Sequence, residues 1–344
     1  MRLINLVRLS LVLTFIVIML GAYTRLADAG LGCPDWPGCY GHLTVPNESH
    51  EIALAKSLYP SLTVEAHKAW LEMIHRYFAG TLGLVVFAIT FLCLRSRAVS
   101  FGLPVLLSLV IVFQALLGMW TVTMKLMPIV VMGHLLGGFT LFSLLCLLYW
   151  KLRDSTCPAL DEVKASAGLR VLSMVTLGVV VLQIALGGWT SSNYAALMCT
   201  SLPICQGDWV NYLDFKTAFQ LLQPHSDSYE FGTLEYGARM TIHVTHRFGA
   251  LLVTLLSLAM VYRLLCTESL RLKSAAKRVA LLLGIQILLG VSNVLFSLPL
   301  VIAVAHNLGA ALLLVSVLQV NYLLLASTSK VSANSGLVSK ESVR

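Results

Sequence analysis

The sequence predicts an all-α integral membrane protein whose eight transmembrane helices form two parallel-repeat four-helix bundles. Three observations lead to this fold class. The 344 residues are 58% hydrophobic and only 12% charged, with a mean hydropathy of +0.83, well above ordinary soluble domains. Apolar runs long enough to cross a bilayer occur eight times. Motifs of the first half return in the second half at nearly constant spacing.

Each apolar run has the length of about 20 residues that a helix needs to span the hydrocarbon core. The runs cover residues 8–27, 71–94, 102–123, 128–150, 169–190, 240–264, 278–297 and 300–325. Very short connections join the third run to the fourth and the seventh to the eighth, so we expect each pair to form a helical hairpin. The first run lacks a small-residue cleavage site and continues into a polar loop, which favours a helix over a signal peptide.

Basic residues predict the orientation in the membrane, because cytoplasmic loops are enriched in Lys and Arg. One side holds 16 of the 24 basic residues: Arg2, Arg8, Arg95, Arg97, Lys151, Arg153, Lys164, Arg170, Arg263, Arg271, Lys273, Lys277, Arg278, Lys330, Lys340 and Arg344. We therefore expect both termini in the cytoplasm of a bacterium and the long loops, 28–70 and 191–239, outside its inner membrane. The net charge of +8 follows from this bias and indicates no nucleic-acid partner.

Four cysteines lie in the two outer loops, as two pairs with the spacing C-x5-C: Cys33 with Cys39, and Cys199 with Cys205. In an oxidising compartment such local pairs are typical of disulfides. A zinc site is the alternative, although zinc loops more often use closer spacing. The other four cysteines are expected to stay reduced: Cys93, Cys146, Cys157 and Cys266.

An internal repeat relates the two halves of the chain. Thr24 and Thr190, Cys33 and Cys199, and Cys39 and Cys205 are each 166 residues apart; His75-Arg76 and His246-Arg247 are 171 apart; Gln114 and Gln286, and His134 and His306, are 172 apart. Each half has an even number of spans, so the copies run parallel about an axis along the membrane normal. We expect one four-helix half at 1–160, a second at 161–326, and a disordered cytoplasmic tail at 327–344.

Two intramembrane histidines in each half are the candidate ligands. Imidazole is costly in hydrocarbon unless it is paired or bound to a metal. Facing histidines on neighbouring helices are suited to hold one haem iron, which predicts one haem from His75 and His134 and another from His246 and His306. Hydrogen bonds to neighbouring helices are the alternative for a single histidine. Nearby glycines leave room for a flat macrocycle or serve helix packing: Gly80, Gly137, Gly138, Gly249 and Gly309.

The two copies differ one turn before the His-Arg pair, where the first has Glu72 and the second has His243. Glu72 and His75 share a helix face by their i,i+3 spacing. Glu72 is therefore a candidate general base or proton relay, with a salt bridge or an interfacial acid as the alternative. Arg76 and Arg247 are candidates to pair with haem propionates, or else extend to lipid headgroups.

These motifs resemble the haem A synthase family. The stretch Gly21-Ala-Tyr-Thr-Arg-Leu-Ala-Asp-Ala-Gly-Leu-Gly-Cys-Pro-Asp-Trp-Pro-Gly-Cys39 is similar to that family's first-loop signature. The family's remaining motifs are matched by Glu72-x2-His75-Arg76, His134-Leu-Leu-Gly, His246-Arg247 and His306-Asn-Leu-Gly. The resemblance extends from the first predicted helix to the eighth.

The resemblance implies an oxidoreductase that oxidises the C8 methyl group of haem O to a formyl group, by successive hydroxylations, to make haem A for terminal cytochrome oxidase. It implies that His75 and His134 hold the substrate haem O, that His246 and His306 hold haem b, and that Glu72 is the functional carboxylate. The outer cysteine pairs match the family's loop disulfides. Cys33–Cys39 resembles the pair with a proposed redox role, and a structural crosslink fits this spacing equally well.

The resemblance also implies partners: the haem O synthase that supplies the substrate, an electron donor or acceptor, membrane lipid and a second copy of the chain. Two other classes of protein compete with this assignment. A di-haem b, quinone-linked electron-transfer subunit is compatible with the four histidines, but it gives no role to Glu72. A transporter or haem exporter built on a duplicated bundle gives no reason for matched ligand pairs.

Overall fold

The computed structural model describes the backbone of residues 3–156 and 166–341, and side chains as far as residue 325. Within these ranges eight helices are long and apolar enough to cross a membrane, as predicted. They are α1 (Leu3–Leu26), α3 (Ala66–Ser96), α4 (Gly102–Thr123), α5 (Pro128–Thr156), α6 (Ala167–Ser192), α8 (Tyr236–Leu265), α9 (Leu270–Leu295) and α10 (Leu300–Glu341). Short helices lie in the two outer loops: α2 (Ser49–Leu58), η1 (Trp209–Tyr212) and α7 (Phe215–Ala218).

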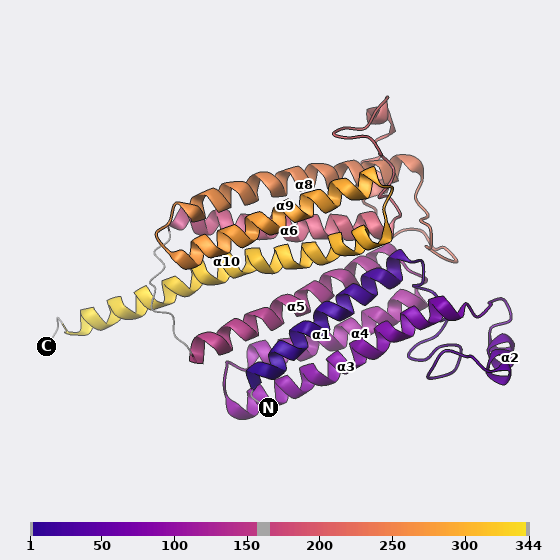
Figure 1. The fold of residues 1–344 in the computed structure, drawn as a ribbon, viewed down its shortest axis with the longest axis horizontal. Coiled ribbons are helices and arrows are strands. Elements are labelled where there is room, and N and C mark those ends of the chain that lie inside the picture. Colours follow the sequence, from indigo (N-terminus) through magenta and orange to yellow (C-terminus); the bar gives the residue numbers. More distant parts are fainter. Residues whose placement is uncertain (1–2, 157–165, 342–344) are drawn as a thin grey trace.

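The eight long helices pack as two groups of four (Figure 1). In the first group α1 contacts α3, α3 contacts α4, α4 contacts α5, and α5 returns to α1. In the second group α6, α8, α9 and α10 make the corresponding contacts in the same order. One apolar core lies in the first group, and a second core fills the other group and continues onto α1 and α5, which is consistent with two four-helix bundles packed against each other.

The contacts between the bundles follow the repeat. Helix α1 lies against α10, α5 lies against α6, and α5 also contacts α10. In the repeat, α1 corresponds to α6 and α5 corresponds to α10. The α1–α10 contact is therefore equivalent to the α6–α5 contact, and the α5–α10 contact is equivalent to itself with the two halves exchanged. This pattern is the one expected of two copies related by a two-fold axis. In the part of the chain that the structure describes, α3 and α4 contact no helix of the second bundle and therefore face lipid.

The hairpin turns of the two halves also match. Lys125 and Leu126 join α4 to α5 with φ of 51° and 63°, and Ser297 and Leu298 join α9 to α10 with φ of 56° and 63°. The amide of Leu126 donates to the Thr121 carbonyl at 2.8 Å. Left-handed conformations are rare for side chains other than glycine, so two such residues at positions 172 apart are a clear structural trace of the repeat.

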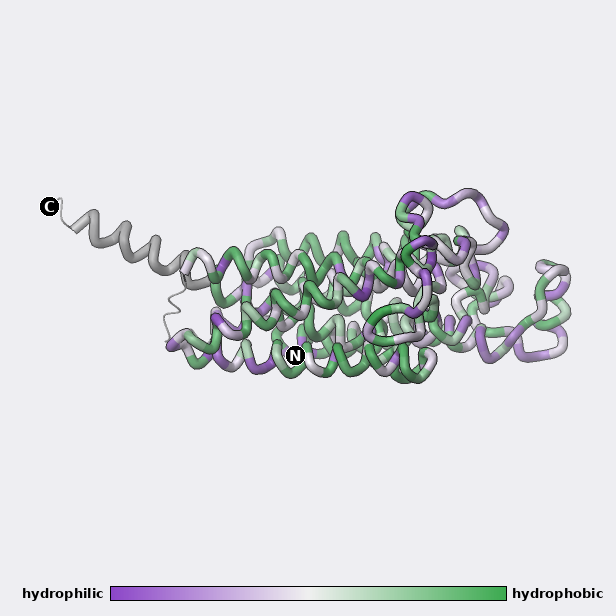
Figure 2. The backbone as a smooth tube through the Cα atoms, turned by 90° about the horizontal axis from the view of Figure 1, so that it is seen from above, coloured by the Kyte–Doolittle hydropathy of each residue, from purple (hydrophilic) through white to green (hydrophobic). Residues whose placement is uncertain are grey.

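Hydropathy and direction agree with the predicted membrane arrangement. Apolar residues cover the helices, whereas polar residues gather in the long loops at one end (Figure 2). Helix α1 begins, and α10 ends, away from these loops (Figure 1). Cys157, Lys164, the predicted boundary at 160/161 and the side chains of the predicted tail at 327–344 lie outside the described residues, so these assignments stay predictions.

A buried polar contact ties α6 to α10 at the end of the second bundle remote from the long loops. The Ser173 hydroxyl donates to Asn321 Oδ1 at 2.9 Å, and Asn321 Nδ2 donates to the carbonyls of Ser173 and Val317, both at 3.0 Å. Both side chains are buried. In hydrocarbon these hydrogen bonds have no water to replace them.

We expect Asn321→Leu to lower the free energy of unfolding in detergent by about 1 kcal/mol, because it removes the hydrogen bonds that join Asn321 to the Ser173 hydroxyl and carbonyl across the two helices. Titration with a denaturing detergent, followed by circular dichroism, measures this change. The double variant Ser173→Ala/Asn321→Leu should lose little more than Asn321→Leu alone, since both substitutions remove the same contact between the helices. An unchanged unfolding curve for Asn321→Leu would show that the contact contributes nothing.

Candidate active site

A cavity of about 860 Å³ lies inside the first bundle, a size typical of small-molecule sites. Its walls come from α1, α3, α4, α5 and the first outer loop, with a few residues of α6 and α10. The four residues that the sequence singles out in this half all line it: Glu72, His75, Arg76 and His134. The structure therefore brings together side chains that are up to 62 positions apart, from Glu72 to His134.

The two histidines lie across this cavity from each other. The ring centroids of His75 and His134 are 6.4 Å apart, and the ring planes are nearly perpendicular at 85°. A metal ion binds an imidazole nitrogen at about 2 Å, so two rings on opposite sides of one iron have centroids roughly 6 Å apart. The Nδ1 atoms of both rings are buried and have no hydrogen-bond partner in the described part of the chain. The spacing fits a haem held between the two rings.

A glycine on the neighbouring helix faces each of the four histidines. A Cβ atom added to the glycine would lie 2.8 to 3.4 Å from the imidazole Cε1. The pairs are Gly21 with His75, Gly118 with His134, Gly187 with His246, and Gly290 with His306. Each histidine ring therefore packs directly against a helix backbone, which fixes its orientation. The sequence analysis gave these glycines no role, although their spacing in the repeat is the signal that identifies them.

Several glycines expected to leave room for a macrocycle do something else. A Cβ atom on Gly137, Gly249 or Gly309 would overlap a glutamine amide: Gln114, Gln183 or Gln286, respectively. For these three positions the expected open space is absent, because the glycine lets a glutamine of the adjacent helix approach the backbone. Gly80 is different, since an added Cβ would meet nothing within 4 Å.

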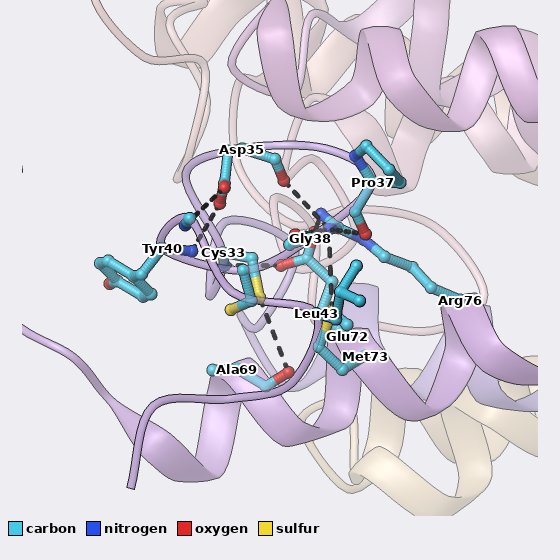
Figure 3. The surroundings of a disulfide bond; sticks show 12 residues. Cys33, Asp35, Pro37, Gly38, Tyr40, Leu43, Ala69, Glu72, Met73 and Arg76 are labelled. Carbon is cyan, nitrogen blue, oxygen red and sulfur yellow. Dashed lines mark hydrogen bonds and ion pairs between the residues drawn. A yellow bond between two sulfur atoms is a disulfide. The ribbon is translucent and has the colours of Figure 1, made fainter. Parts of the chain in front are cut away.

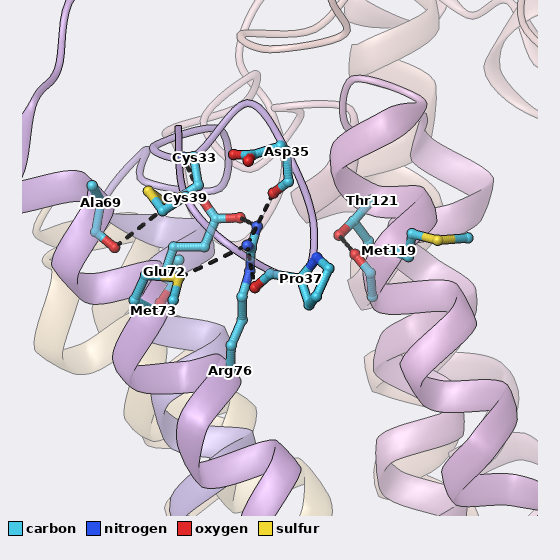
Figure 4. Close-up of polar contacts among 12 residues, drawn as sticks. Cys33, Asp35, Pro37, Cys39, Ala69, Glu72, Met73, Arg76, Met119 and Thr121 are labelled. Carbon is cyan, nitrogen blue, oxygen red and sulfur yellow. Dashed lines mark hydrogen bonds and ion pairs between the residues drawn. A yellow bond between two sulfur atoms is a disulfide. The ribbon is translucent and has the colours of Figure 1, made fainter. Parts of the chain in front are cut away.

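Glu72 is buried at the outer end of the cavity, with 5% of its surface exposed. One carboxylate oxygen lies 2.5 Å from Nη2 of Arg76, and the other accepts a hydrogen bond from the Cys33 amide at 2.9 Å (Figures 3 and 4). A buried carboxylate needs such partners to remain charged. Glu72 thus makes the salt bridge that the sequence left open, and it also lines the cavity.

Arg76 holds the first outer loop onto α3. Its Nη1 donates to the carbonyl of Asp35 at 3.0 Å, to that of Pro37 at 3.2 Å and to that of Gly38 (Figure 3). Only 12% of the side chain is exposed, so Arg76 does not extend to lipid headgroups. Its contact with a propionate stays a prediction.

The second half repeats this arrangement with a histidine in place of the acid. Arg247 Nη1 donates to the Ser201 carbonyl at 2.7 Å, and Arg247 Nε donates to Nε2 of His243 at 2.9 Å. Because Nε2 accepts that hydrogen bond, His243 carries its proton on Nδ1 and donates it to the Ala195 carbonyl at 2.9 Å. His243 is therefore neutral and links Arg247 to the Ala195 carbonyl, whereas the matched residue in the first half, Glu72, is a carboxylate.

Both predicted disulfides are formed, Cys33–Cys39 and Cys199–Cys205. The first is fully buried and lies over α3, with Cys33 Sγ 3.8 Å from the Ala69 carbonyl (Figure 3). Among the described residues no group of three or more His, Cys, Asp or Glu side chains is arranged to hold a metal ion by itself, so the zinc alternative finds no support. Cys93, Cys146 and Cys266 are free, as expected.

Arg25 is a cavity residue that the sequence analysis missed, although it lies within the first-loop signature. It reaches from the end of α1 into the second half, where it donates to the Tyr194 hydroxyl at 2.9 Å and to the Ser191 carbonyl at 2.8 Å. The guanidinium also lies 4.2 Å from the Tyr194 ring centroid. Burial raises the pKa of the Tyr194 phenol, which therefore keeps its proton and accepts from Arg25. Arg25 joins the two halves beside the cavity.

Comparison with known proteins now identifies the family. The family model COX15-CtaA, described as cytochrome oxidase assembly protein, matches residues 5–318. The chain belongs to this family. A curated relative, the heme A synthase of Shewanella oneidensis, is 54% identical over 332 residues, which cover 96% of this chain and 99% of the relative. The heme A synthases of Nitrosospira multiformis and Caulobacter sp. are 26% and 28% identical, over 90% and 88% of this chain and 90% of each relative.

Each of the two loop-binding arginines should protect the disulfide of its own loop from reduction. Replacing one arginine should therefore expose one disulfide only. We expect Arg76→Gln to speed the reduction of Cys33–Cys39 by about tenfold, because each charged hydrogen bond contributes about 1.5–3 kcal/mol to holding the loop. The rate for Cys199–Cys205 should not change. Thiol labelling and mass spectrometry under limiting dithiothreitol measure both rates in one sample.

Arg247→Gln is the matched control for this experiment and should reverse the pattern, exposing Cys199–Cys205 alone. Equal acceleration of both disulfides by either variant would mean that the arginines stabilise the whole outer surface rather than their own loops.

Proposed function

We propose that this protein is a haem A synthase, which oxidises the C8 methyl group of haem O to a formyl group by successive hydroxylations. The observation that carries the proposal is the first-bundle cavity, where a facing histidine pair and a buried, ion-paired carboxylate line one chamber. The 54% identity to the heme A synthase of Shewanella oneidensis, over nearly the whole chain, supports the same reaction.

In this proposal His75 and His134 hold the iron of haem O, and His246 and His306 hold a resident haem b. The supporting observation is that all four rings pack on glycines at matched positions of the repeat. Haem iron supplies the redox chemistry of the methyl oxidation. The two helices that carry these histidines would hold the group rigidly, and the apolar wall of the cavity would exclude water from it.

Glu72 is the proposed base of the reaction. Its carboxylate, whose ionised form is favoured by Arg76 and the Cys33 amide, has further lone pairs that take up one proton at Oε1 or Oε2. The last step, loss of water from a geminal diol to leave the formyl group, requires removal of a hydroxyl proton. Glu72 lines the chamber in which that proton is released, and the second half has the neutral His243 at the matched position.

A di-haem b, quinone-linked cytochrome is the competing function for the same four histidines. The differences between the halves favour the enzyme. An electron-transfer protein with two equivalent haems has no need of a carboxylate, Glu72, in the first half only. A haem exporter likewise leaves the carboxylate and the matched ligand pairs without a role.

We further infer that the protein lies in the bacterial inner membrane with both termini in the cytoplasm. The support is the concentration of 16 of 24 basic residues on the side opposite the long loops. The proposed partners are a haem O synthase, an electron donor or acceptor, and a second copy of the chain. A reporter fused after residue 344 tests the orientation, since it should be active only if it folds in the cytoplasm.

Replacing the proposed base should stop the reaction without removing its substrate. We expect Glu72→Gln to keep bound haem O and to lower haem A formation by at least 100-fold, as is usual for loss of a general base. Haem extraction and chromatography from cells that also make haem O measure both quantities. His243→Gln, at the matched position, should leave haem A formation unchanged.

Two outcomes would contradict the proposed function. Haem A formation by Glu72→Gln at the rate of the unchanged protein would exclude the carboxylate as the base. An unchanged protein that holds only haem b, with no haem O, haem A or hydroxylated intermediate, would favour the electron-transfer alternative.

Replacing ligands should separate the two haem sites. We expect His75→Ala to lose haem O and keep haem b, and His246→Ala to lose haem b, because each removes one of the two histidines that would hold the iron in one bundle only. Redox difference spectra of the purified variants and haem extraction distinguish the two losses. Loss of both haems from either variant would show that the sites are not independent.

A further inference from the structure

We propose that the first-bundle cavity has a side opening between α3 and α4 through which the isoprenoid tail of haem O passes into the membrane. The inference rests on the proposed function, because haem O and haem b differ by this tail. We name this feature the α3–α4 opening and define it by five residues that line the cavity: Gly80, Gly83 and Phe87 on α3, and Val112 and Leu116 on α4.

The opening reaches the outer surface of the bundle. Phe87 and Val112 are each 47% exposed and Leu116 is 41% exposed, although all three line the cavity. A side chain that lines the cavity and is also exposed on the outside of the bundle marks a place where the cavity wall is one residue thick or absent. The surface in question faces lipid, because α3 and α4 contact no helix of the second bundle in the described part of the chain.

Two glycines keep the space between the helices free. A Cβ atom added to Gly80 would meet nothing within 4 Å, and one added to Gly83 would meet only Ile111, at 3.9 Å. These glycines differ from the four that face histidines, whose added Cβ atoms would lie against a ring. Since they do not serve close helix packing, their effect is an unfilled gap beside the cavity.

The repeat provides an internal comparison. With the shift of 171 residues that relates His75 to His246, Gly80 corresponds to Leu251 and Gly83 to Thr254. The second bundle therefore has side chains where the first has none. This difference agrees with the chemistry, because a resident haem b has no tail and needs no opening, whereas haem O does.

Further side chains show that the cavity is built for a ligand whose polar part stays inside. Gln114 lines it with 7% of its surface exposed, and its Nε2 atom has no hydrogen-bond partner among the described residues. Arg25 and Arg76 lie at the outer end. The α3–α4 opening itself is apolar. Polar groups at one end and an apolar exit on the lipid side suit a haem with a long hydrocarbon substituent.

The test fills the opening with the residues of the second bundle. The variant Gly80→Leu/Gly83→Thr is expected to bind haem O at least tenfold more weakly than the unchanged protein, and to bind haem b in the first bundle equally well. Full-length protein in lipid nanodiscs, with its second-bundle haem in place, is titrated with haem O and separately with haem b. Gly178→Leu on α6 is the control, because Gly178 is exposed, its added Cβ meets nothing, and it lies outside the cavity lining.

Unchanged haem O affinity in the double variant would overturn the proposal that the tail passes through the α3–α4 opening. If the double variant loses both haem O and haem b, Leu116→Trp decides from the opposite helix: weaker binding of haem O alone supports the opening, and equal effects on both haems overturn it. Failure of the proposed function looks different, since the unchanged protein would then neither bind nor convert haem O.

Discussion

The buried arginine that follows the first histidine of each bundle is the interaction on which both halves depend. Arg76 and Arg247 each donate to carbonyls of a disulfide-closed outer loop. A guanidinium has five N–H donors in one plane, so one side chain satisfies several loop carbonyls at once. Since the arginine and the histidine are adjacent on one helix, the loop, the arginine and the histidine ring are fixed as one unit. The outer surface therefore determines the geometry of a site within the membrane.

Duplication explains the shared parts of the two bundles, and a few replacements explain their different roles. The facing glycines, the hairpin turns and the disulfide loops recur. One difference concerns the histidine itself. Gln183 Nε2 lies 3.0 Å from Nδ1 of His246 in a hydrogen bond, whereas Val17 at the matched position offers His75 no side-chain partner. The two bundles therefore differ in the side chain that lies beside the first histidine.

The sequence predicted the fold and the members of the site because both depend on regular patterns. Apolar length identified the eight spans, and the spacing of His75, His134, His246 and His306 in the repeat identified a common role. Packing between helices has no such pattern. Whether Gly137 leaves space or receives the Gln114 amide depends on how α4 lies against α5, and a sequence read one helix at a time contains no such information. Arg25 was missed for the same reason, since its partners lie 166 and 169 positions away in the other half.

The contacts of Glu72 show how a salt bridge and the proposed role as a base can coexist in one residue. A carboxylate buried without partners would take up a proton and lose its capacity as a base. Arg76 and the Cys33 amide favour the charged form of Glu72 and leave further lone pairs on its carboxylate. The same contacts connect the carboxylate to the Cys33–Cys39 loop, so a change in that disulfide alters the hydrogen bond that one Glu72 oxygen receives. The loop is thus part of the electrostatic environment of the proposed base, and the second bundle, where His243 replaces the acid, keeps the loop without that consequence.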